Sequence, residues 1–296
     1  MKNIQLKYKD RNQVSDITYN AEGQKAGELL FDGEVGYITY PVLEELPYIK
    51  HCFSTRLGGV SKEHLSSMNL SFSRGDEEEN VRENYRRICR AIQIDPNDLV
   101  FSDQVHDTKI HVVTEEDRGK GYRFKRELEG LDGLITDCSN IPLVTYYADC
   151  VPLYFVDIKN KTIGLSHSGW KGTVNKMAVH TIKAMQKEFG TNPEDVIAVI
   201  GPSICRDCYE ISEDVATEFM KAYPKEIADT LLEKKTGGKY QLDLWLANIA
   251  NCVEAGIPRK NITNSNICTC CNHDVFYSHR ASNGMRGNLA AFLSKG

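Results

Sequence analysis

The sequence of 296 residues lacks the features that mark a membrane protein, an exported protein or a nucleic-acid-binding protein. It contains no apolar run of the roughly 18 residues that a membrane-spanning helix needs. The first residues, MKNIQLKYKDRN, lack the apolar core of a signal peptide, so we expect a cytoplasmic protein. The 36 basic residues do not outnumber the 41 acidic residues, whereas a nucleic-acid footprint requires a basic face. We therefore expect neither a membrane nor a nucleic acid as a partner.

Internal repeats and low-complexity linkers are also absent, so no composition shift divides the chain into separate units. Segments with strand-like and with helical patterns mix along the whole length. This mixture predicts a single α/β domain over residues 1–296 with a large mixed sheet system. Short strands are expected at about residues 1–36, where alternating segments such as 4–8 and 28–31 are separated by glycine-containing turns.

Helical periodicity predicts three helices that matter for the later argument. Residues 76–94 carry an apolar face at helical spacing. Residues 173–189 form a second amphipathic pattern, and Met177 and Met185 lie on its apolar stripe. A methionine stripe at this spacing is normally core packing, so we do not expect these two side chains to bind copper. Residues 286–294 are expected to form a short final helix.

The chain is organised around residues 143–172. This stretch predicts three short strands, because it is rich in β-branched and aromatic residues. The three strands cover residues 143–147, 151–157 and 162–167. Cys150 lies between the first two strands, and His167 ends the third. Strand ends are rigid supports from which side chains point into a cleft, so we expect a thiol and an imidazole in one active site.

A second histidine, His106, follows another strand-like segment. Together, His106, Cys150 and His167 offer two nitrogen ligands and one sulfur ligand, which suits a zinc ion that keeps its fourth position for water. Zinc would lower the pKa of that water toward about 7. The spacing of the three residues is long and forms no local motif. On residue types alone, ordinary burial of two histidines and a cysteine is the simpler interpretation.

The same atoms also support a hypothesis without metal. Cys150 would act as a nucleophile, with His167 or His106 as its base and Asp149 or Ser168 as the group that orients the base. This arrangement is equally non-local, so the residues alone do not separate the two hypotheses.

Ten cysteines without an export signal are expected to stay reduced. Cys205-x-x-Cys208 and Cys268-x-Cys270-Cys271 have the number and spacing of cysteines that a four-sulfur zinc site needs. Pairs of this kind also occur as tight turns with buried thiols, and we favour that simpler interpretation.

Several segments, read together and in order, carry a resemblance that none of them carries alone. They are Phe53-Ser54-Thr55-Arg56, Gln104-Val105-His106, Asp132-Gly133-Leu134-Ile135-Thr136, Ala148-Asp149-Cys150-Val151-Pro152, His167-Ser168-Gly169-Trp170-Lys171-Gly172, Gly201-Pro202-Ser203-Ile204, Cys208-Tyr209-Glu210, Cys268-Thr269 and Phe276-Tyr277-Ser278-His279-Arg280. The ordered set resembles the laccase-domain family, also called the multicopper polyphenol oxidase or bacterial-type purine nucleoside phosphorylase family. The resemblance covers about residues 35–292.

The resemblance implies a fold, a metal and an activity. The implied fold is an α+β sandwich of layered mixed sheets flanked by helices, related to a cytotoxic deamidase with a Cys-His pair. The implied ligands of one zinc ion are His106, Cys150 and His167. The implied activity is phosphorolysis of adenosine, inosine, guanosine and methylthioadenosine, together with deamination of adenosine. Glycine often stands in the family where this chain has Cys205, so the resemblance treats the Cys205–Cys208 pair as incidental.

Motif membership suggests further site residues. We expect Arg56 and Arg280 to contact phosphate and substrate, Asn69 to contact substrate, and Asp149 to orient a ligand or act as a base. The expected partners are purine nucleosides and phosphate, and the expected state is a monomer or a homodimer. Copper-dependent oxidation of phenols is the alternative activity, with copper as the metal. Its trinuclear centres need many histidines, whereas this chain has eight in all.

Overall fold

The computed structural model describes residues 4–9, 27–125 and 127–296, which form two six-stranded sheets and one small sheet. The first sheet has the order β1-β2-β3-β15-β7-β4. Its strands are β1 (Glu28–Asp32), β2 (Val35–Thr39), β3 (Ile49–Ser54), β4 (Val100–Phe101), β7 (Leu143–Tyr147) and β15 (Leu289–Lys295). All neighbours in this sheet are antiparallel except β4 and β7, which run parallel.

The second large sheet has the order β14-β10-β8-β9-β6-β5. Its strands are β5 (Ile110–Val112), β6 (Gly133–Thr136), β8 (Val151–Asp157), β9 (Thr162–Ser168), β10 (Val196–Ile200) and β14 (Ile262–Asn264). The small sheet joins β11 (Glu210–Ser212), β13 (Lys239–Leu242) and β12 (Leu232–Lys234). Each sheet therefore combines segments that are far apart in the sequence.

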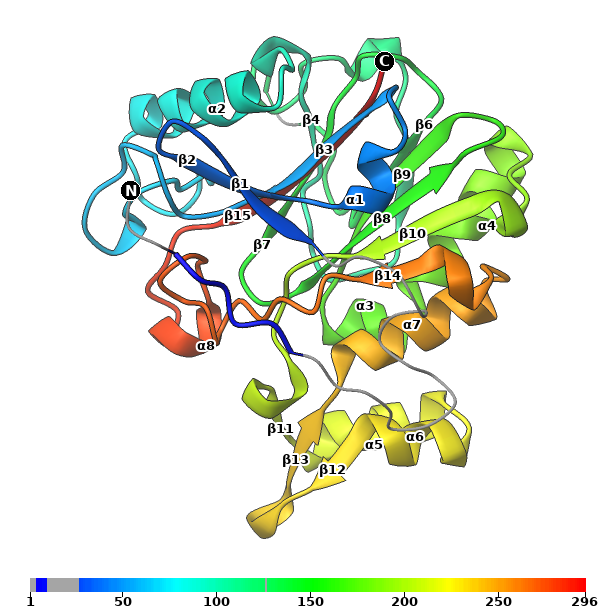
Figure 1. Cartoon of the computed structure of the whole chain (residues 1–296). Helices are drawn as coiled ribbons and strands as arrows, with labels where there is room; N and C mark the ends of the chain where they lie inside the picture. Colours follow the sequence, from blue (N-terminus) through cyan, green and yellow to red (C-terminus); the bar gives the residue numbers. More distant parts are fainter. Residues whose placement is uncertain (1–3, 10–26, 126) are drawn as a thin grey trace.

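Helices α2, α4 and α7 cover outer faces of the two large sheets, whereas α5 and α6 lie beside the small sheet (Figure 1). The α-helices of the described residues are α1 (Pro41–Glu44), α2 (Glu78–Ala91), α3 (Trp170–Val174), α4 (Met177–Phe189), α5 (Glu213–Ala222), α6 (Lys225–Leu231), α7 (Leu244–Glu254) and α8 (His279–Ser282). Helix α2 packs its apolar face on the first sheet, with Tyr85 against Phe101 and Phe292. Helices α4 and α7 cover the second sheet, where Ile182 and Trp245 share one apolar cluster with Phe155.

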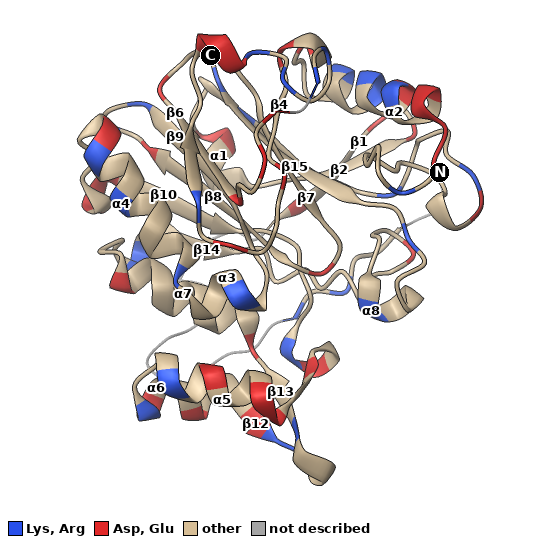
Figure 2. Ribbon diagram, turned by 180° about the vertical axis from the view of Figure 1, so that it is seen from behind, with Lys and Arg blue, Asp and Glu red and all other residues tan. Residues whose placement is uncertain are grey.

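The two large sheets pack face to face, so the core is layered as helix, sheet, sheet and helix. Phe53 and Tyr147 from the first sheet share a buried cluster with Tyr154 and Leu165 from the second. Every residue of β8 and β9 is buried, and burial on both faces explains why β8 is an unbroken apolar run up to Val156 rather than an alternating pattern. Charged residues lie mainly on the helices and loops of the periphery (Figure 2). The prediction of mixed sheets flanked by helices in a sandwich is confirmed.

The predicted helix at residues 76–94 is found with shorter bounds, whereas the predicted helix at residues 173–189 is divided into two. The first is α2, which begins two residues later and ends three residues earlier. The second is interrupted: α3 ends at Val174, and Lys176 takes a left-handed conformation with φ of 63° before α4 begins. The predicted core role of Met177 and Met185 is confirmed, because both are fully buried.

The predicted final helix at residues 286–294 is wrong, because β15 (Leu289–Lys295) occupies this position in the middle of the first sheet. Its sequence, Leu-Ala-Ala-Phe-Leu-Ser-Lys, contains good helix formers. The strand nevertheless pairs on both sides, with β3 and β7, and buries all residues but the last. Tertiary pairing therefore overrides the local preference.

The strands expected near the N-terminus are found only in part. β1 and β2 form a hairpin that turns at Gly33, where φ is 59°. Residues 4–8 form no strand, and Tyr8 makes only an isolated bridge to Ile267. The expectation for residues 1–3 and 10–26 falls outside the described residues. Across residues 4–9, 27–125 and 127–296, none of the helices has both the length and the apolarity needed to cross a bilayer.

Candidate metal centre

Three potential metal ligands converge where the chain passes from one large sheet to the other. His106 lies in the loop after β4, Cys150 lies in the link between β7 and β8, and His167 is the penultimate residue of β9. One ligand atom from each side chain lies within 4.8 Å of the others. His167 is buried, Cys150 is half-buried and His106 is exposed, so the group opens to solvent on the side of His106. The zinc hypothesis drawn from the sequence required these three side chains to lie together.

The fold positions Cys150 and His167 through strand pairing. β8 and β9 are antiparallel neighbours in which Pro152 pairs with His167 and Val151 pairs with Ser168. Cys150, the residue before β8, is therefore placed beside the end of β9. His106 arrives from the first sheet, and its backbone is left-handed with φ of 63°. Non-glycine residues in this conformation are uncommon and concentrate at functional sites.

Asp132, which we did not select as a site residue from the sequence, connects these parts. The Nδ1 atom of His167 donates a hydrogen bond of 2.7 Å to Oδ1 of Asp132. The same carboxylate accepts from the backbone N–H groups of Val105, His106 and Asp107 at 2.9, 3.1 and 3.0 Å. One buried carboxylate therefore orients His167 and folds the loop that carries His106. The signal in the sequence was the Asp132-Gly133-Leu134-Ile135-Thr136 segment.

The bond to Asp132 decides which nitrogen of His167 can bind a metal. Because Nδ1 donates to the carboxylate, Nε2 is the nitrogen whose lone pair becomes available when the ring loses its second proton, as on metal binding. A carboxylate behind a metal-binding histidine fixes the tautomer and the ring orientation, and it makes the ligand nitrogen more basic. Such a partner accompanies most histidine ligands in metal sites, so its presence fits a metal-binding role.

Gly169 gives a second test of whether the site fits a metal. A Cβ atom added to Gly169 would lie 2.6 Å from Nδ1 of His106 and 3.2 Å from the sulfur of Cys150. The backbone of Gly169 is extended, with φ of −71°, so its conformation does not require glycine. The missing side chain therefore leaves space between a nitrogen and a sulfur donor. The donor set and this space together fit one metal ion.

The electrostatics tie His167 to Cys150 and Asp132. Burial lowers the pKa of His167, but the charge and hydrogen-bond interactions with Cys150 and Asp132 outweigh burial and raise this pKa to about 9. Burial raises the pKa of Asp132, but hydrogen bonds from His167 and from backbone N–H groups bring it below the ordinary value. Partial desolvation of the His106 ring by its neighbours and the nearby His167 lower the pKa of His106. The site therefore favours an ionised carboxylate and a neutral His106.

Asp149 acts on the turn that carries Cys150. Its φ of 86° reverses the chain between β7 and β8. Its Oδ1 accepts a hydrogen bond of 2.7 Å from the Thr269 hydroxyl, and its Oδ2 accepts one of 2.7 Å from the backbone N–H of Arg280. The backbone carbonyl of Asp149 accepts from Ile204 N–H at 3.0 Å. The residue therefore anchors two neighbouring loops to the Cys150 turn.

The metal-free hypothesis requires a correction about the orienting group. The group behind His167 is Asp132, neither Asp149 nor Ser168. The Ser168 hydroxyl instead shares hydrogen bonds of 3.0 and 2.9 Å with Asn248 and Thr173.

Three residues predicted to contact substrate form hydrogen bonds within the protein. Arg56 donates to the carbonyls of Ser66 and His273. Arg280 donates to the carbonyls of Cys208 and Glu210. Asn69 is fully buried, and its amide forms four hydrogen bonds, which satisfy both donors and both acceptor lone pairs. All four hydrogen-bonding positions of the Asn69 amide are therefore used within the protein.

A hollow of about 150 Å³ contains Arg56, one of these predicted contacts, in its lining. It is lined by Arg56 and Arg286 together with His64, His273, Tyr277 and other residues of the 276–286 segment. Arg286 lies close enough to Cys150 and Asp149 for their charges to affect its pKa, which burial lowers to about 10. Its buried Nε atom has no hydrogen-bond partner within the described residues. A larger hollow of about 590 Å³ lies on the α2 side, and none of the three potential ligands lines either hollow.

Comparisons with known proteins agree on one family. Residues 50–295 match the family described as multi-copper polyphenol oxidoreductase laccase. The chain is 36% identical over 242 residues to purine nucleoside phosphorylase YlmD of Bacillus subtilis, covering 81% of this chain and 86% of the relative. It is 34% identical over 245 residues to adenosine deaminase RL5 of an unknown prokaryotic organism, covering 80% and 93%. The crystal structure of the hypothetical protein YfiH of Bacillus licheniformis matches with a TM-score of 0.84 at 32% identity, covering 90% of this chain and 99% of that one.

Proposed function

Because the chain belongs to the multi-copper polyphenol oxidoreductase laccase family, we propose that it is a zinc-dependent purine nucleoside phosphorylase that also deaminates adenosine. The proposed substrates are adenosine, inosine, guanosine and methylthioadenosine, and phosphorolysis yields the free base and ribose 1-phosphate. The names of the relatives supply the substrate class. The observation that carries the proposal is the meeting of His106, Cys150 and His167, with Asp132 behind His167.

His106, Cys150 and His167 would hold the ion, and its proposed identity rests on the donor set. Two imidazoles and one thiolate with an open side suit zinc in a catalytic site. When bound, zinc supplies Lewis acidity to a water or a substrate atom. Asp132 keeps Nε2 of His167 available, and Asp149 holds the Cys150 turn through Thr269.

The two reactions make different demands on the protein. Deamination adds water to C6 of the purine and releases ammonia, so a group that moves protons is needed near the open side. Phosphorolysis forms a bond from a phosphate oxygen to C1′ while the bond to the purine breaks, and the electron pair leaves with the base. The protein must therefore hold a phosphate anion and stabilise the charge on the departing purine.

The proposed place for the phosphate is the small hollow lined by Arg286, whose pKa the charges of Cys150 and Asp149 affect. Two guanidinium groups, Arg56 and Arg286, line it, and two histidines add positive potential when protonated. Arg56 is stacked over the Tyr277 ring at 4.8 Å, which fixes its position. The unpartnered Nε of Arg286 is a donor without an acceptor, and an anion would supply one. The predicted role of Arg280 shifts in this proposal to holding the loop of Cys208.

Two other activities remain as alternatives with their own observations. A copper-dependent polyphenol oxidase is favoured by the family's description. Within the described residues, however, His106 and His167 are the only histidines in a potential metal group, which is too few for a multicopper centre. A metal-free Cys-His hydrolase is favoured by the succession of Cys150, His167 and Asp132.

The test is product analysis with adenosine. The protein is purified under reducing conditions, its metal is quantified, and it is incubated with adenosine with and without phosphate. We expect adenine and ribose 1-phosphate only when phosphate is present; inosine should form in both cases and go on to hypoxanthine when phosphate is present. Cys150→Ala should abolish all of these products, whereas Cys138→Ser, which changes a half-buried thiol in a remote turn, should leave them unchanged. Phenol oxidation that survives Cys150→Ala would overturn the proposal.

A further inference from the structure

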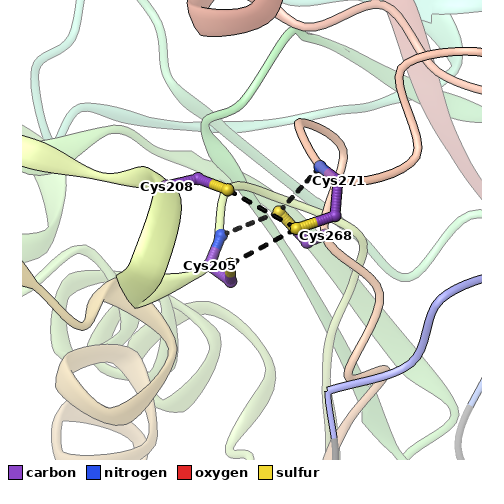
Figure 3. Close-up of side chains that lie close together, drawn as sticks. All are labelled: Cys205, Cys208, Cys268 and Cys271. Atoms are coloured by element: carbon purple, nitrogen blue, oxygen red, sulfur yellow. Dashed lines mark hydrogen bonds between the residues drawn. The ribbon is translucent and has the colours of Figure 1, made fainter.

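A second group of potential ligands, distinct from the metal centre described above, is formed by two Cys-x-x-Cys segments. Cys205 and Cys208 come from the loop after β10, and Cys268 and Cys271 come from the turn that follows β14. Figure 3 shows the four side chains directed into the space between the two loops. Their sulfur atoms all lie within 4.8 Å of one another. From the sequence we favoured separate tight turns with buried thiols, and that interpretation did not predict that the four sulfurs would lie together.

The spacing of the sulfurs matches that around a single metal ion. The sulfur of Cys271 lies 3.5 Å from that of Cys208 and 3.9 Å from that of Cys205. Four thiolates at about 2.3 Å from one zinc ion occupy the corners of a tetrahedron whose edge is about 3.8 Å. A disulfide would bring two sulfurs to about 2.05 Å. A cluster of several iron atoms would hold the four sulfurs farther apart than one ion does.

We propose that Cys205, Cys208, Cys268 and Cys271 form a tetrathiolate zinc site. Cys205 and Cys268 are buried and Cys208 and Cys271 are half-buried, so the site is closed. All four protein positions are filled by sulfur, which leaves none for water or substrate. A closed site of four thiolates is the pattern of structural zinc rather than catalytic zinc.

The surroundings stabilise negative charge on the sulfurs. The backbone N–H groups of Cys205 and Cys271 donate to the sulfur of Cys268 at 3.2 and 3.3 Å. Lys9 forms an ion pair of 3.3 Å with Asp207, which lies between Cys205 and Cys208. Four thiolates around a divalent cation carry a net charge of minus two, and the Lys9–Asp207 pair adds no net charge to it. The two backbone N–H donors therefore supply the stabilisation, as hydrogen bonds from outside the coordination sphere do for metal ligands.

The four-cysteine site is linked to the turn that carries Cys150. Ile204, the neighbour of Cys205, donates its N–H to the carbonyl of Asp149 at 3.0 Å. Thr269, between Cys268 and Cys271, donates its hydroxyl to the carboxylate of Asp149 at 2.7 Å. The zinc would therefore hold both loops that anchor Asp149. This role is structural and holds whether or not the proposed purine activity is correct.

The test counts metal ions by ligand set. The wild-type protein and its variants are purified in reductant, and metal is measured by inductively coupled plasma mass spectrometry. We expect two zinc ions per chain in the wild type, one in Cys150→Ala and one in Cys208→Ser. Cys270→Ser is the matched control, because Cys270 lies beside the site in sequence but outside the group of four. It should retain two zinc ions.

Cobalt substitution then identifies the ligands of the remaining ion. Cobalt bound to four thiolates gives strong sulfur-to-metal absorption in the near ultraviolet, whereas a site with one thiolate gives little. Cys150→Ala should keep most of the wild-type band, and Cys208→Ser should lose most of it.

Cys150→Ala leaves all four cysteines intact, so it decides the question even if Cys208→Ser does not fold. No metal in reduced Cys150→Ala, iron in place of zinc, or a disulfide between Cys208 and Cys271 in the freshly reduced protein would overturn the proposal. A wild-type protein with one zinc ion per chain and the cobalt spectrum of a one-thiolate site would overturn it as well.

Discussion

Asp132→Asn removes the charge that holds His167 and rearranges the loop of His106. In the wild type, Oδ1 accepts from His167 Nδ1 and His106 N–H, and Oδ2 accepts from the N–H groups of Val105 and Asp107. An amide has only one acceptor oxygen. If that oxygen stays with His167, the NH2 group faces two N–H donors, and if it turns, His167 loses its acceptor. Either orientation breaks two of the four hydrogen bonds.

The expected effect is on metal affinity. Removing a partner that orients a metal ligand typically weakens binding by about 10- to 100-fold, which equals about 1.4 to 2.7 kcal/mol. We expect this loss for zinc at the centre of His106, Cys150 and His167, measured by competition with a chelator of known affinity. Activity at limiting zinc should fall with occupancy, and excess zinc should restore most of it. A rescue of this kind distinguishes a positioning residue from a general loss of fold.

The matched control is Asp137→Asn, because Asp137 is an exposed carboxylate just past the end of β6, five residues after Asp132. Its zinc affinity should equal that of the wild type. A zinc affinity of Asp132→Asn within twofold of the wild type would refute the argument that Asp132 orients His167.

Three further predictions test other parts of the account. Gly169→Ala should fold, because φ of −71° suits alanine, but its Cβ would crowd Nδ1 of His106, so zinc content at this centre should fall while the circular dichroism spectrum is kept. Burial lowers the pKa of His51 to about 3, and its neutral Nε2 accepts from Tyr40 N–H. Stability from this neutral histidine is complete above the unfolded pKa of about 6.5 and is lost as pH falls toward 3, a loss of about 2 kcal/mol at pH 5. Urea unfolding of His51→Gln should therefore show a smaller decrease in stability between pH 7.5 and pH 5 than the wild type, and an equal decrease would contradict this. Arg286→Ala should raise KM for phosphate about tenfold through loss of a charged hydrogen bond, with zinc content unchanged; an unchanged KM would remove Arg286 from the phosphate site.

The residues that the sequence could predict lie where local patterns carry the information. The strands that flank Cys150 and end at His167 are dense in β-branched and aromatic residues, and β7, β8 and β9 follow the predicted ranges within one residue. The ordered set of motifs also identified the family, which the comparisons confirm. These features depend on short segments, so no knowledge of distant neighbours was needed.

The features that the sequence did not predict depend on long-range contacts. β15 has a helical preference but forms a central strand, because it pairs with β3 on one side and with β7 on the other. Asp132 is 35 residues from His167, so nothing local marks it as the partner of that histidine. The same reason applies to the four cysteines, because two short motifs can be counted in a sequence but their meeting depends on the whole second sheet.

The most direct test of the central claim is reconstitution of the metal-free protein with one metal at a time. A chelator removes the metal, and the release of hypoxanthine from inosine is then followed in phosphate buffer after addition of zinc, copper or nothing. We predict no release without metal, recovery with zinc, and no comparable recovery with copper. Full activity in the metal-free protein would contradict the account and favour a Cys150–His167 nucleophile, and recovery by copper alone would favour the oxidase alternative.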